Sequence, residues 1–268
     1  MPTHQCRKRF GQNFLQDSIV IAQIVRAINP RQTEHVIEIG PGLGAITKPL
    51  LPLAAKIDVI ELDLDLIPKL QEQFGNEPNF AVHQGDILKF DLSSLIPKDS
   101  MVRIIGNLPY NISTPLMFHL LQYTNNITDM HFMLQKEVAI RLAAQPGNKD
   151  YGRLSVMIQY HCKVEVMFEV KPTSFNPAPK VQSAFVRLTP VQHKKMVPIN
   201  FKVFKEITTL AFNQRRKTVQ NSLKTKFTKD DFVNLNIDPM LRPEQLSIEN
   251  YITLSNYAAR DILTINPQ

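Results

Sequence analysis

The sequence lacks the features that mark membrane-spanning, secreted and zinc-binding proteins. No stretch of about 18 apolar residues occurs, which argues against a membrane-spanning helix. The first residues, MPTHQCRKRFGQNFLQD, are polar and basic and have no apolar core, so they do not resemble a secretory signal. The cysteines, Cys6 and Cys162, have neither the Cys nor the His neighbours of a zinc site. These absences favour a cytoplasmic protein without a metal, in which the cysteines stay reduced.

The chain does have enough apolar residues for a sizeable core, and its charge is unevenly distributed. Hydrophobic residues make up 43% of the 268 residues, enough for one large core and a smaller second one. The net charge is +7: residues 191–268 hold 12 Lys and Arg against 7 Asp and Glu, residues 1–17 hold three against one, and the rest is neutral. Basic ends are typical of proteins that bind nucleic acid, although solvated Lys and Arg faces give the same pattern.

Short apolar runs alternate with amphipathic segments over residues 35–170. The runs are rich in Ile, Val or Phe and are bounded by Gly, Pro, Asn or Asp, as buried strands are. They cover residues 35–39, 56–62, 80–84, 101–105 and 129–134. Because helix-like segments lie between them, the pattern predicts an α/β fold: a mostly parallel, doubly wound sheet with helices on both faces.

The pattern changes after about residue 154. Two more apolar runs, 164–170 and 183–188, predict further strands, which could lie antiparallel at one sheet edge. A loop with three prolines separates them. Residues 189–200 read as a linker, and the chain beyond has helical spacing. We therefore predict a domain over residues 1–190 and a small, basic, all-helical domain over residues 191–268.

A glycine-rich turn follows the first predicted strand. In the segment VIEIGPGLGAIT, the strand runs into Gly40, Gly42 and Gly44, and a helix then begins. Glycines allow a tight turn and the close approach of a ligand, and a doubly wound sheet binds the adenosine part of a cofactor at this place. The spacing is G-x-G-x-G and not the dinucleotide pattern G-x-G-x-x-G, so a purely structural turn is the alternative.

Acidic residues mark the ends of the next two strands. Glu61 lies 17 residues after Gly44, where a carboxylate can accept hydrogen bonds from both ribose hydroxyls. Asp86 follows the strand 80–84 and can accept a hydrogen bond from the adenine amino group of a cofactor, although Asp is also a common turn residue. The order of these strand ends fits both a dinucleotide oxidoreductase and a methyltransferase that uses S-adenosylmethionine.

The segment Asn107-Leu108-Pro109-Tyr110, after the fourth strand, favours the methyltransferase. It is similar to the N/D-P-P-Y/F motif of methyltransferases that act on amino groups. The exocyclic nitrogen of adenine is a poor nucleophile because its lone pair is delocalised into the ring. The side-chain oxygen of Asn107 and the carbonyl of Leu108 or Pro109 can accept hydrogen bonds from its N–H groups, so that the lone pair points at the methyl donor.

The rest of this segment fits the same chemistry. Pro109 fixes φ and helps to hold the carbonyl, and Tyr110 can stack on the face of an extruded base. Asn107 would also contact the cofactor. Positioning and electrostatics are sufficient for such a transfer, and the sequence offers no obvious nucleophile, metal or strong general base. A Pro-containing turn with a buried Tyr is the alternative.

At these residues the chain resembles the small-subunit (16S) ribosomal RNA adenine N6-dimethyltransferase family, known as KsgA, over nearly its whole length. Further matching segments are KRFGQNFL (8–15), QKEVAIRL (135–142) and FNPAPKVQS (175–183). The resemblance implies a Rossmann-like class I methyltransferase domain with S-adenosylmethionine as its cofactor and a C-terminal helical domain that recognises RNA. It also implies that Asn13 and Leu15 contact the cofactor.

The resemblance suggests residues that contact the target RNA. Phe175 could be a second aromatic face for the target base, opposite Tyr110. The alternative is that Phe175 only packs within its loop. Arg215, Arg216 and Lys217 would suit phosphate contacts, and a solvated helix end is their alternative.

The activity of this family implies the reaction. The enzyme would convert two adjacent adenosines near the 3′ end of 16S rRNA to N6,N6-dimethyladenosine on a partly assembled 30S subunit. It would thereby act in ribosome biogenesis, and loss of the modification is associated with kasugamycin resistance in the family. We expect a cytoplasmic monomer that binds small-subunit rRNA and no membrane.

Other functions stay open at this point. A sister branch methylates a large-subunit rRNA adenine and gives macrolide resistance, but the segment 211–223 here resembles the small-subunit branch. Some relatives act as assembly or transcription factors for which methylation is dispensable. A Rossmann-type oxidoreductase leaves the segment 107–110 and the basic ends unexplained. A DNA adenine methyltransferase is disfavoured because no separate target-recognition domain is visible.

Overall fold

The computed structural model describes residues 12–191 and 196–265, and this described part divides into two compact units. The first unit contains the chain up to Ala139 together with Lys163–Pro190. The second unit contains Ile140–Cys162 and the chain from Val191 onward. One of the divisions falls at the predicted domain boundary, residue 190, whereas the sequence pattern alone places Ile140–Cys162 in the first domain. In the described ranges, no helix combines the length and the apolar character needed to cross a membrane.

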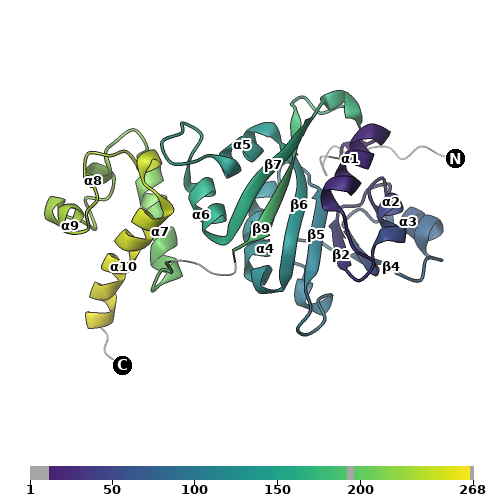
Figure 1. Ribbon diagram of the computed structural model, residues 1–268, viewed down its shortest axis with the longest axis horizontal. Coiled ribbons are helices and arrows are strands. Elements are labelled where there is room, and N and C mark those ends of the chain that lie inside the picture. The colour runs from purple at the N-terminus through teal and green to yellow at the C-terminus, as the bar shows by residue number, and fades with distance from the viewer. Residues whose placement is uncertain (1–11, 192–195, 266–268) are drawn as a thin grey trace. The chain divides into compact units, whose positions relative to one another are not determined.

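The described part of the first unit is built around a seven-stranded sheet with the order β4-β3-β2-β5-β6-β9-β7 (Figure 1). The strands are β2 (His35–Ile39), β3 (Lys56–Glu61), β4 (Phe80–Gln84), β5 (Val102–Asn107), β6 (Ile127–Gln135), β7 (Cys162–Val170) and β9 (Ser183–Pro190). Strands β4, β3, β2, β5 and β6 are parallel, and β9 is antiparallel to β6. The predicted mostly parallel α/β sheet is therefore confirmed, including an antiparallel strand near one edge.

The N-terminal segment forms structure that the sequence did not predict. A short strand, β1 (Phe14–Leu15), pairs antiparallel with β8 (Phe175–Asn176). The helix α1 (Ser18–Ile28) follows, and it begins where the Asp17 side chain accepts hydrogen bonds from the N–H groups of Ile19 and Val20. Its spacing places Val20, Ile24 and Ile28 on one buried face, which belongs to the same apolar cluster as residues of β2, β3 and β5. Burial of each such side chain contributes about 1.5–3 kcal/mol.

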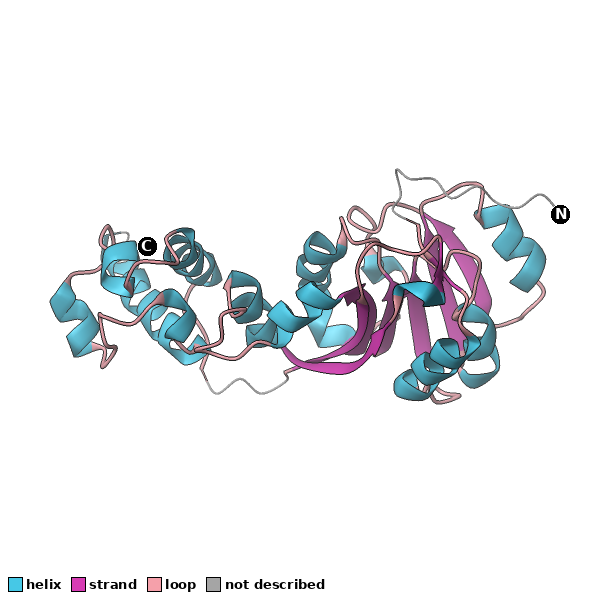
Figure 2. Ribbon diagram, turned by 90° about the horizontal axis from the view of Figure 1, so that it is seen from above, coloured by secondary structure: helices cyan, strands magenta, loops and turns pink. Residues whose placement is uncertain are grey.

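The remaining elements are helical. In the first unit they are α2 (Thr47–Leu50), α3 (Ile67–Phe74) and α4 (Ser113–Leu120), and α5 (Lys136–Ala143) leads into the second unit. The second unit contains α6 (Arg153–His161), α7 (Phe201–Asn213), α8 (Val219–Ser222), α9 (Lys229–Asn234) and α10 (Ile248–Ile265), and Figure 2 shows its described part as helices joined by loops. The predicted C-terminal helical region is thus confirmed. Helix α8 is short and ends at Ser222, although the sequence beyond residue 200 has helical spacing.

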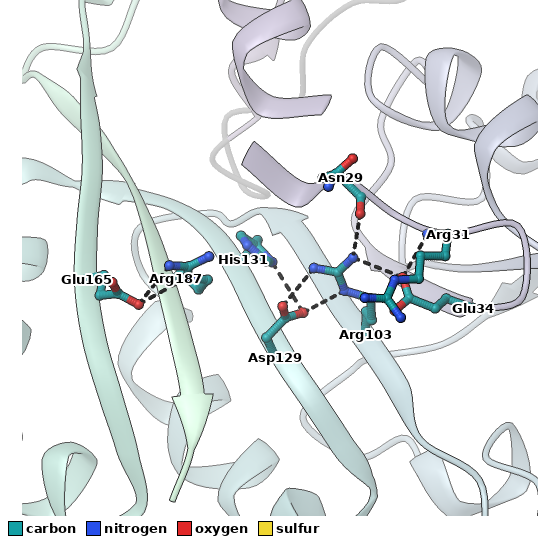
Figure 3. Close-up of polar contacts among 8 residues, drawn as sticks. All are labelled: Asn29, Arg31, Glu34, Arg103, Asp129, His131, Glu165 and Arg187. Carbon is teal, nitrogen blue, oxygen red and sulfur yellow. Dashed lines mark hydrogen bonds and ion pairs between the residues drawn. The ribbon is translucent and has the colours of Figure 1, made fainter. Parts of the chain in front are cut away.

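A buried ionic network holds the C-terminal end of α1 against the sheet (Figure 3). Arg103 on β5 donates to both carboxylate oxygens of Asp129 on β6, at 2.8 and 2.7 Å. Its Nη1 donates to Glu34, at 3.0 Å, and to the carbonyl oxygen of Asn29, at 3.3 Å. Asn29 is the left-handed residue that ends α1. Because a helix end leaves carbonyls without partners, Arg103 both pairs a buried acid and caps this helix.

The charge of Asp129 depends on these partners. Burial alone would raise its pKa, but His131 and Arg103 together lower the pKa to about 2. A carboxyl group whose pKa is depressed on folding stabilises the protein above its unfolded pKa, which is about 4, and the contribution is lost as the pH falls through the folded value. The network therefore stabilises the fold at neutral pH and weakens in acid.

We predict that Asp129→Asn lowers the free energy of unfolding by about 3 kcal/mol at pH 7, because the buried Arg103 would lose the carboxylate that its Nε and Nη2 bind and would keep only that of Glu34. The difference from the parent should narrow as the pH is lowered below about 4. Urea unfolding at a series of pH values measures both. Glu165→Gln is the matched control, since the pair of Glu165 with Arg187 in Figure 3 is about one-third exposed. Its loss should be below about 1 kcal/mol, and equal losses in both variants would contradict the account.

Candidate active site

The carboxyl ends of β2, β3, β4 and β5 surround a cavity of about 260 Å³, together with the N-terminal segment. The lining comprises residues 12–16, 38–43, 45–46, 60–62, 66, 85–88 and 107–112. Of the predicted site residues, it includes Asn13, Leu15, Gly40, Gly42, Glu61, Asp86, Asn107, Leu108, Pro109 and Tyr110. The structure therefore brings these residues together at one sheet edge, whereas Gly44, which the sequence also assigns to the cofactor, is not part of the lining.

The glycine turn after β2 has backbone angles that favour glycine. Gly40 and Gly44 have φ values of 65° and 78°. A Cβ atom at Gly44 would lie 2.4 Å from the ring of Phe74, so this glycine allows α3 to pack against the turn. A Cβ atom at Gly40 would meet no atom within 4 Å, because this residue faces the cavity. Gly42 lies under the ring of Phe14 from the N-terminal segment, 3.0 Å from where its Cβ would be.

Glu61 is held by backbone donors at the end of β3. Its Oε1 accepts hydrogen bonds from the N–H groups of Leu62 and Asp63, both at 2.8 Å, and its Oε2 accepts one from Gly42 at 3.3 Å. The residue is 6% exposed. Burial raises the pKa of Glu61, although the backbone donors oppose the rise. The carboxylate is thus fixed in the cavity wall beside the glycine turn.

Glu38 is a cavity residue that the sequence reasoning missed. It lies in β2, 1% exposed, and the Thr47 hydroxyl donates to its Oε2 at 2.6 Å. Burial raises the pKa of Glu38 to about 7, and the nearby charge of Glu61 adds to the rise. The available signal was an acidic residue inside an otherwise apolar strand, directly before the glycine turn. Two buried acids with raised pKa values therefore line the cavity, and such a wall suits a ligand with positive charge or several hydrogen-bond donors.

Asp86 lies in the loop after β4. Its Oδ1 accepts a hydrogen bond from the N–H of Leu88 at 3.0 Å, which is an Asx turn. Asp86 also lines the cavity. Its roles as a turn residue and as a partner for an adenine amino group are therefore compatible.

The side chain of Asn107 is oriented by the N-terminal segment. Its Nδ2 donates to the carbonyl oxygen of Asn13 at 2.9 Å. A backbone carbonyl can only accept hydrogen bonds, so the NH₂ end of the amide must face Asn13, and the acceptor Oδ1 is the other end. The same segment is tied down by Gln12, which donates to Asp63 at 2.9 Å, and by Leu15, which is buried in β1. The predicted contribution of this segment to the site thus has a geometric basis, while residues 8–11 of the matching motif lie outside the described residues.

The residues after Asn107 form a tight turn that leads into α4. Leu108 is buried and its N–H donates to the carbonyl of Met133. The N–H of Ile112 donates to the carbonyl of Pro109 at 3.1 Å. The ring of Tyr110 is half-buried, and its hydroxyl lies 2.8 Å from Oγ of Ser183 at the start of β9. Burial raises the pKa of Tyr110, so the phenol stays neutral. The sequence could not indicate the contact of Tyr110 with Ser183, because Ser183 comes from a distant strand.

Phe175 lies outside the cavity lining. It is 5% exposed in β8, opposite Leu15 of β1, and it belongs to the apolar cluster that α1 covers. Packing therefore accounts for its position in this structure, and contact with a target base stays a prediction.

The predicted RNA-binding cations lie in the second unit, at the end of α7. Arg216 and Lys217 are exposed. Arg215 is only half-exposed, because its guanidinium group donates to the carbonyl of Lys149 and lies 3.7 Å from Glu244. Arg216 and Lys217 are therefore better placed than Arg215 to meet a phosphate.

The fold is that of a class I methyltransferase: a mostly parallel sheet with one antiparallel strand beside β6, and a cavity at the carboxyl edge. Solved structures agree. A dimethyladenosine transferase from Plasmodium falciparum superposes with a TM-score of 0.77 at 28% identity, covering 90% of this chain and 95% of that one. The 23S rRNA methyltransferase ErmE superposes with a TM-score of 0.72 at 25% identity, covering 92% and 100%.

Sequence comparison narrows the class to a family. Residues 3–260 match the family described as "Ribosomal RNA adenine dimethylase". A protein from Pseudomonas aeruginosa named "Ribosomal RNA small subunit methyltransferase A" is 54% identical over 96% of each chain, and one of the same name from Marinomonas is 52% identical over 96% of this chain and 97% of its own. This chain belongs to the ribosomal RNA adenine dimethylase family.

We predict that alanine has different effects at two positions of the glycine turn. Gly44→Ala should lower the melting temperature strongly, because the new Cβ atom would overlap the ring of Phe74 in addition to the strained φ. Gly40→Ala adds the strained φ alone, about 1 kcal/mol, but places a methyl group in the cavity. Thermal unfolding and calorimetric binding of S-adenosylhomocysteine separate the effects. Equal melting temperatures, or unchanged ligand affinity in Gly40→Ala, would contradict the description of the turn.

Proposed function

We propose that this protein transfers methyl groups from S-adenosylmethionine to the N6 amino group of adenine in small-subunit ribosomal RNA. The observation that carries the proposal is the orientation of Asn107. Its NH₂ group donates to the carbonyl of Asn13, so its side-chain oxygen is left to accept a hydrogen bond from the target amino group. Membership of the family and the names of the closely similar relatives support the choice of substrate.

The cavity residues fit S-adenosylmethionine. A ribose can donate from both hydroxyls to the carboxylate of Glu61, which is fixed in the wall. Gly40 offers backbone without a side chain on the cavity side. The buried acids Glu38 and Glu61 complement a ligand that carries a sulfonium and an ammonium group. Asp86 would accept from the adenine amino group of the cofactor, and Asn13 and Leu15 would close the cavity over it.

When bound, S-adenosylmethionine supplies an electrophilic methyl group: a new N–C bond forms from the amine lone pair as the S–C bond breaks, and that electron pair stays on sulfur. The protein has to position the amine. Oδ1 of Asn107 and the carbonyl of Leu108 or Pro109 accept hydrogen bonds from N6, which draws the lone pair out of the aromatic ring. Tyr110 holds the base by stacking. The methylated nitrogen is strongly acidic and loses its extra proton to water.

The finer assignment follows the family. We propose that the product is N6,N6-dimethyladenosine at two adjacent positions near the 3′ end of 16S rRNA, formed during 30S assembly in the cytoplasm by a monomer. Arg216 and Lys217, which are exposed, and Arg215, which is half-exposed, would contact rRNA phosphates. The resemblance to ErmE keeps large-subunit RNA as the second candidate substrate.

Methyl transfer from labelled S-adenosylmethionine to unmethylated small subunits tests the proposal, with large subunits and free DNA in parallel reactions. The RNA is digested to nucleosides, which are identified by mass. Dimethyladenosine from small subunits alone is the expected result. Label in large-subunit RNA would replace the proposed substrate, and bound cofactor without any transfer would favour an assembly factor.

We predict that Asn107→Ala loses most methyl transfer, by about 100-fold or more in kcat, because the acceptor for N6 is removed. Binding of S-adenosylhomocysteine, measured by calorimetry, should remain detectable. Asn76→Ala is the matched control, since this asparagine is exposed and lies outside the cavity lining, and it should retain most activity. Parent rates in Asn107→Ala would exclude the hydrogen-bonding role.

Charge reversal at Arg216 and Lys217 should weaken binding to the small subunit in a salt-dependent way. Each lost phosphate contact should reduce the slope of log affinity against log salt by about 1. Lys98→Glu, an exposed reversal at the amino edge of the sheet, is the control. If all variants bind like the parent at every salt concentration, these cations do not contact the RNA.

A further inference from the structure

A hydrogen bond joins the side chains of Tyr110 and Ser183. The hydroxyl oxygens of the two residues lie 2.8 Å apart. Ser183 is fully buried at the start of β9, opposite Gln135 of β6. It is therefore a fixed point in the sheet, and its side chain lies on the same face as that of Asn107.

Tyr110 is held at both ends of its side chain. At the backbone, its carbonyl accepts a hydrogen bond from the Ser113 hydroxyl at 3.1 Å, at the start of α4. At the far end, the phenol meets Ser183. With both ends fixed, the side chain cannot swing about χ1, and the ring keeps its place at the cavity wall.

The chemistry of the acceptor makes this orientation more important as the reaction proceeds. An unmodified adenine amino group has two N–H donors for Asn107 and the adjacent backbone carbonyl. The first transfer replaces one hydrogen by a methyl group, so the amine enters the second transfer with a single N–H. One hydrogen bond that positioned the nitrogen is then absent, and a larger share of the positioning falls on the stacking of the base against Tyr110.

We propose that Ser183 is a positioning residue that fixes the Tyr110 ring through its hydroxyl, and that it acts chiefly on the second methylation of each adenosine. This inference rests on the proposed function. Loss of the Ser183 hydroxyl frees the Tyr110 side chain to swing about χ1, so the first methyl transfer continues while the second, which depends more on the position of the ring, slows. The products then shift from dimethyladenosine toward monomethyladenosine.

The test compares Ser183→Ala, Tyr110→Phe and the double variant with the parent on unmethylated small subunits. Nucleosides are quantified by mass at equal total methyl incorporation. Each single variant should raise the monomethyl share severalfold, and the double variant should match Tyr110→Phe, because both changes remove the same hydrogen bond. A parent-like product ratio in Ser183→Ala, or additive effects in the double variant, would overturn the proposal.

Val186→Ala controls for general weakening of β9. Val186 is fully buried, but its side chain lies on the opposite face of the sheet from Ser183. It should lower the melting temperature without changing the product ratio. A shifted ratio in Val186→Ala as well would assign the effect to stability and overturn the proposal.

A spectroscopic readout tests the anchor without activity. The protein with its six tyrosines replaced by 3-fluorotyrosine gives ¹⁹F signals, and the signal lost in Tyr110→Phe belongs to Tyr110. In Ser183→Ala that signal should move more than the others. An unmoved signal would overturn the anchor. If the unsubstituted protein transfers no methyl group to small subunits, the proposed function fails together with this inference, whereas transfer with an unchanged ratio overturns this inference alone.

Discussion

One hydrogen bond, from Nδ2 of Asn107 to the carbonyl oxygen of Asn13, joins the N-terminal segment to the end of β5. Both residues line the cavity, and Asn107 begins the segment 107–110, which we assign to the target base. Arg103, on the same strand β5, binds the carbonyl of Asn29 at the end of α1. Strand β5 therefore holds the N-terminal segment at two places. Because a carbonyl can only accept a hydrogen bond, the carbonyl of Asn13 determines which end of the Asn107 amide is the NH₂ group.

The same sheet face buries charge in two different ways. Asp129 is buried beside His131 and Arg103, which together lower its pKa against the effect of burial, and this pairing supports the fold. Glu38 and Glu61 are buried with neutral N–H and O–H donors, and burial raises their pKa values. An acid buried without a cation is costly for stability, and both of these acids line the cavity. Asp129 therefore supports the fold, whereas the raised pKa values of Glu38 and Glu61 are what a ligand-binding site often shows.

Much of the site could be predicted because strand ends of a parallel sheet meet at one edge. The positions of Gly40, Glu61, Asp86 and Asn107 follow from that topology and from local sequence alone. Contacts between distant segments could not be predicted. The docking of Asn13 on Asn107 and the partner of Tyr110 depend on how the N-terminal segment and β9 reach the cavity. The packing of Phe175 in the core and the contacts of Arg215 with its own unit likewise needed the structure.

The measurement that tests the central claim most directly is a crystal structure of the protein with S-adenosylhomocysteine and adenosine bound. We predict that Nδ2 of Asn107 keeps its hydrogen bond to the carbonyl of Asn13 and that N6 of the adenosine lies within hydrogen-bond distance of Oδ1. The base should stack on Tyr110. An amide turned so that Oδ1 faces away from N6, or an adenosine bound away from residues 107–110, would contradict the account.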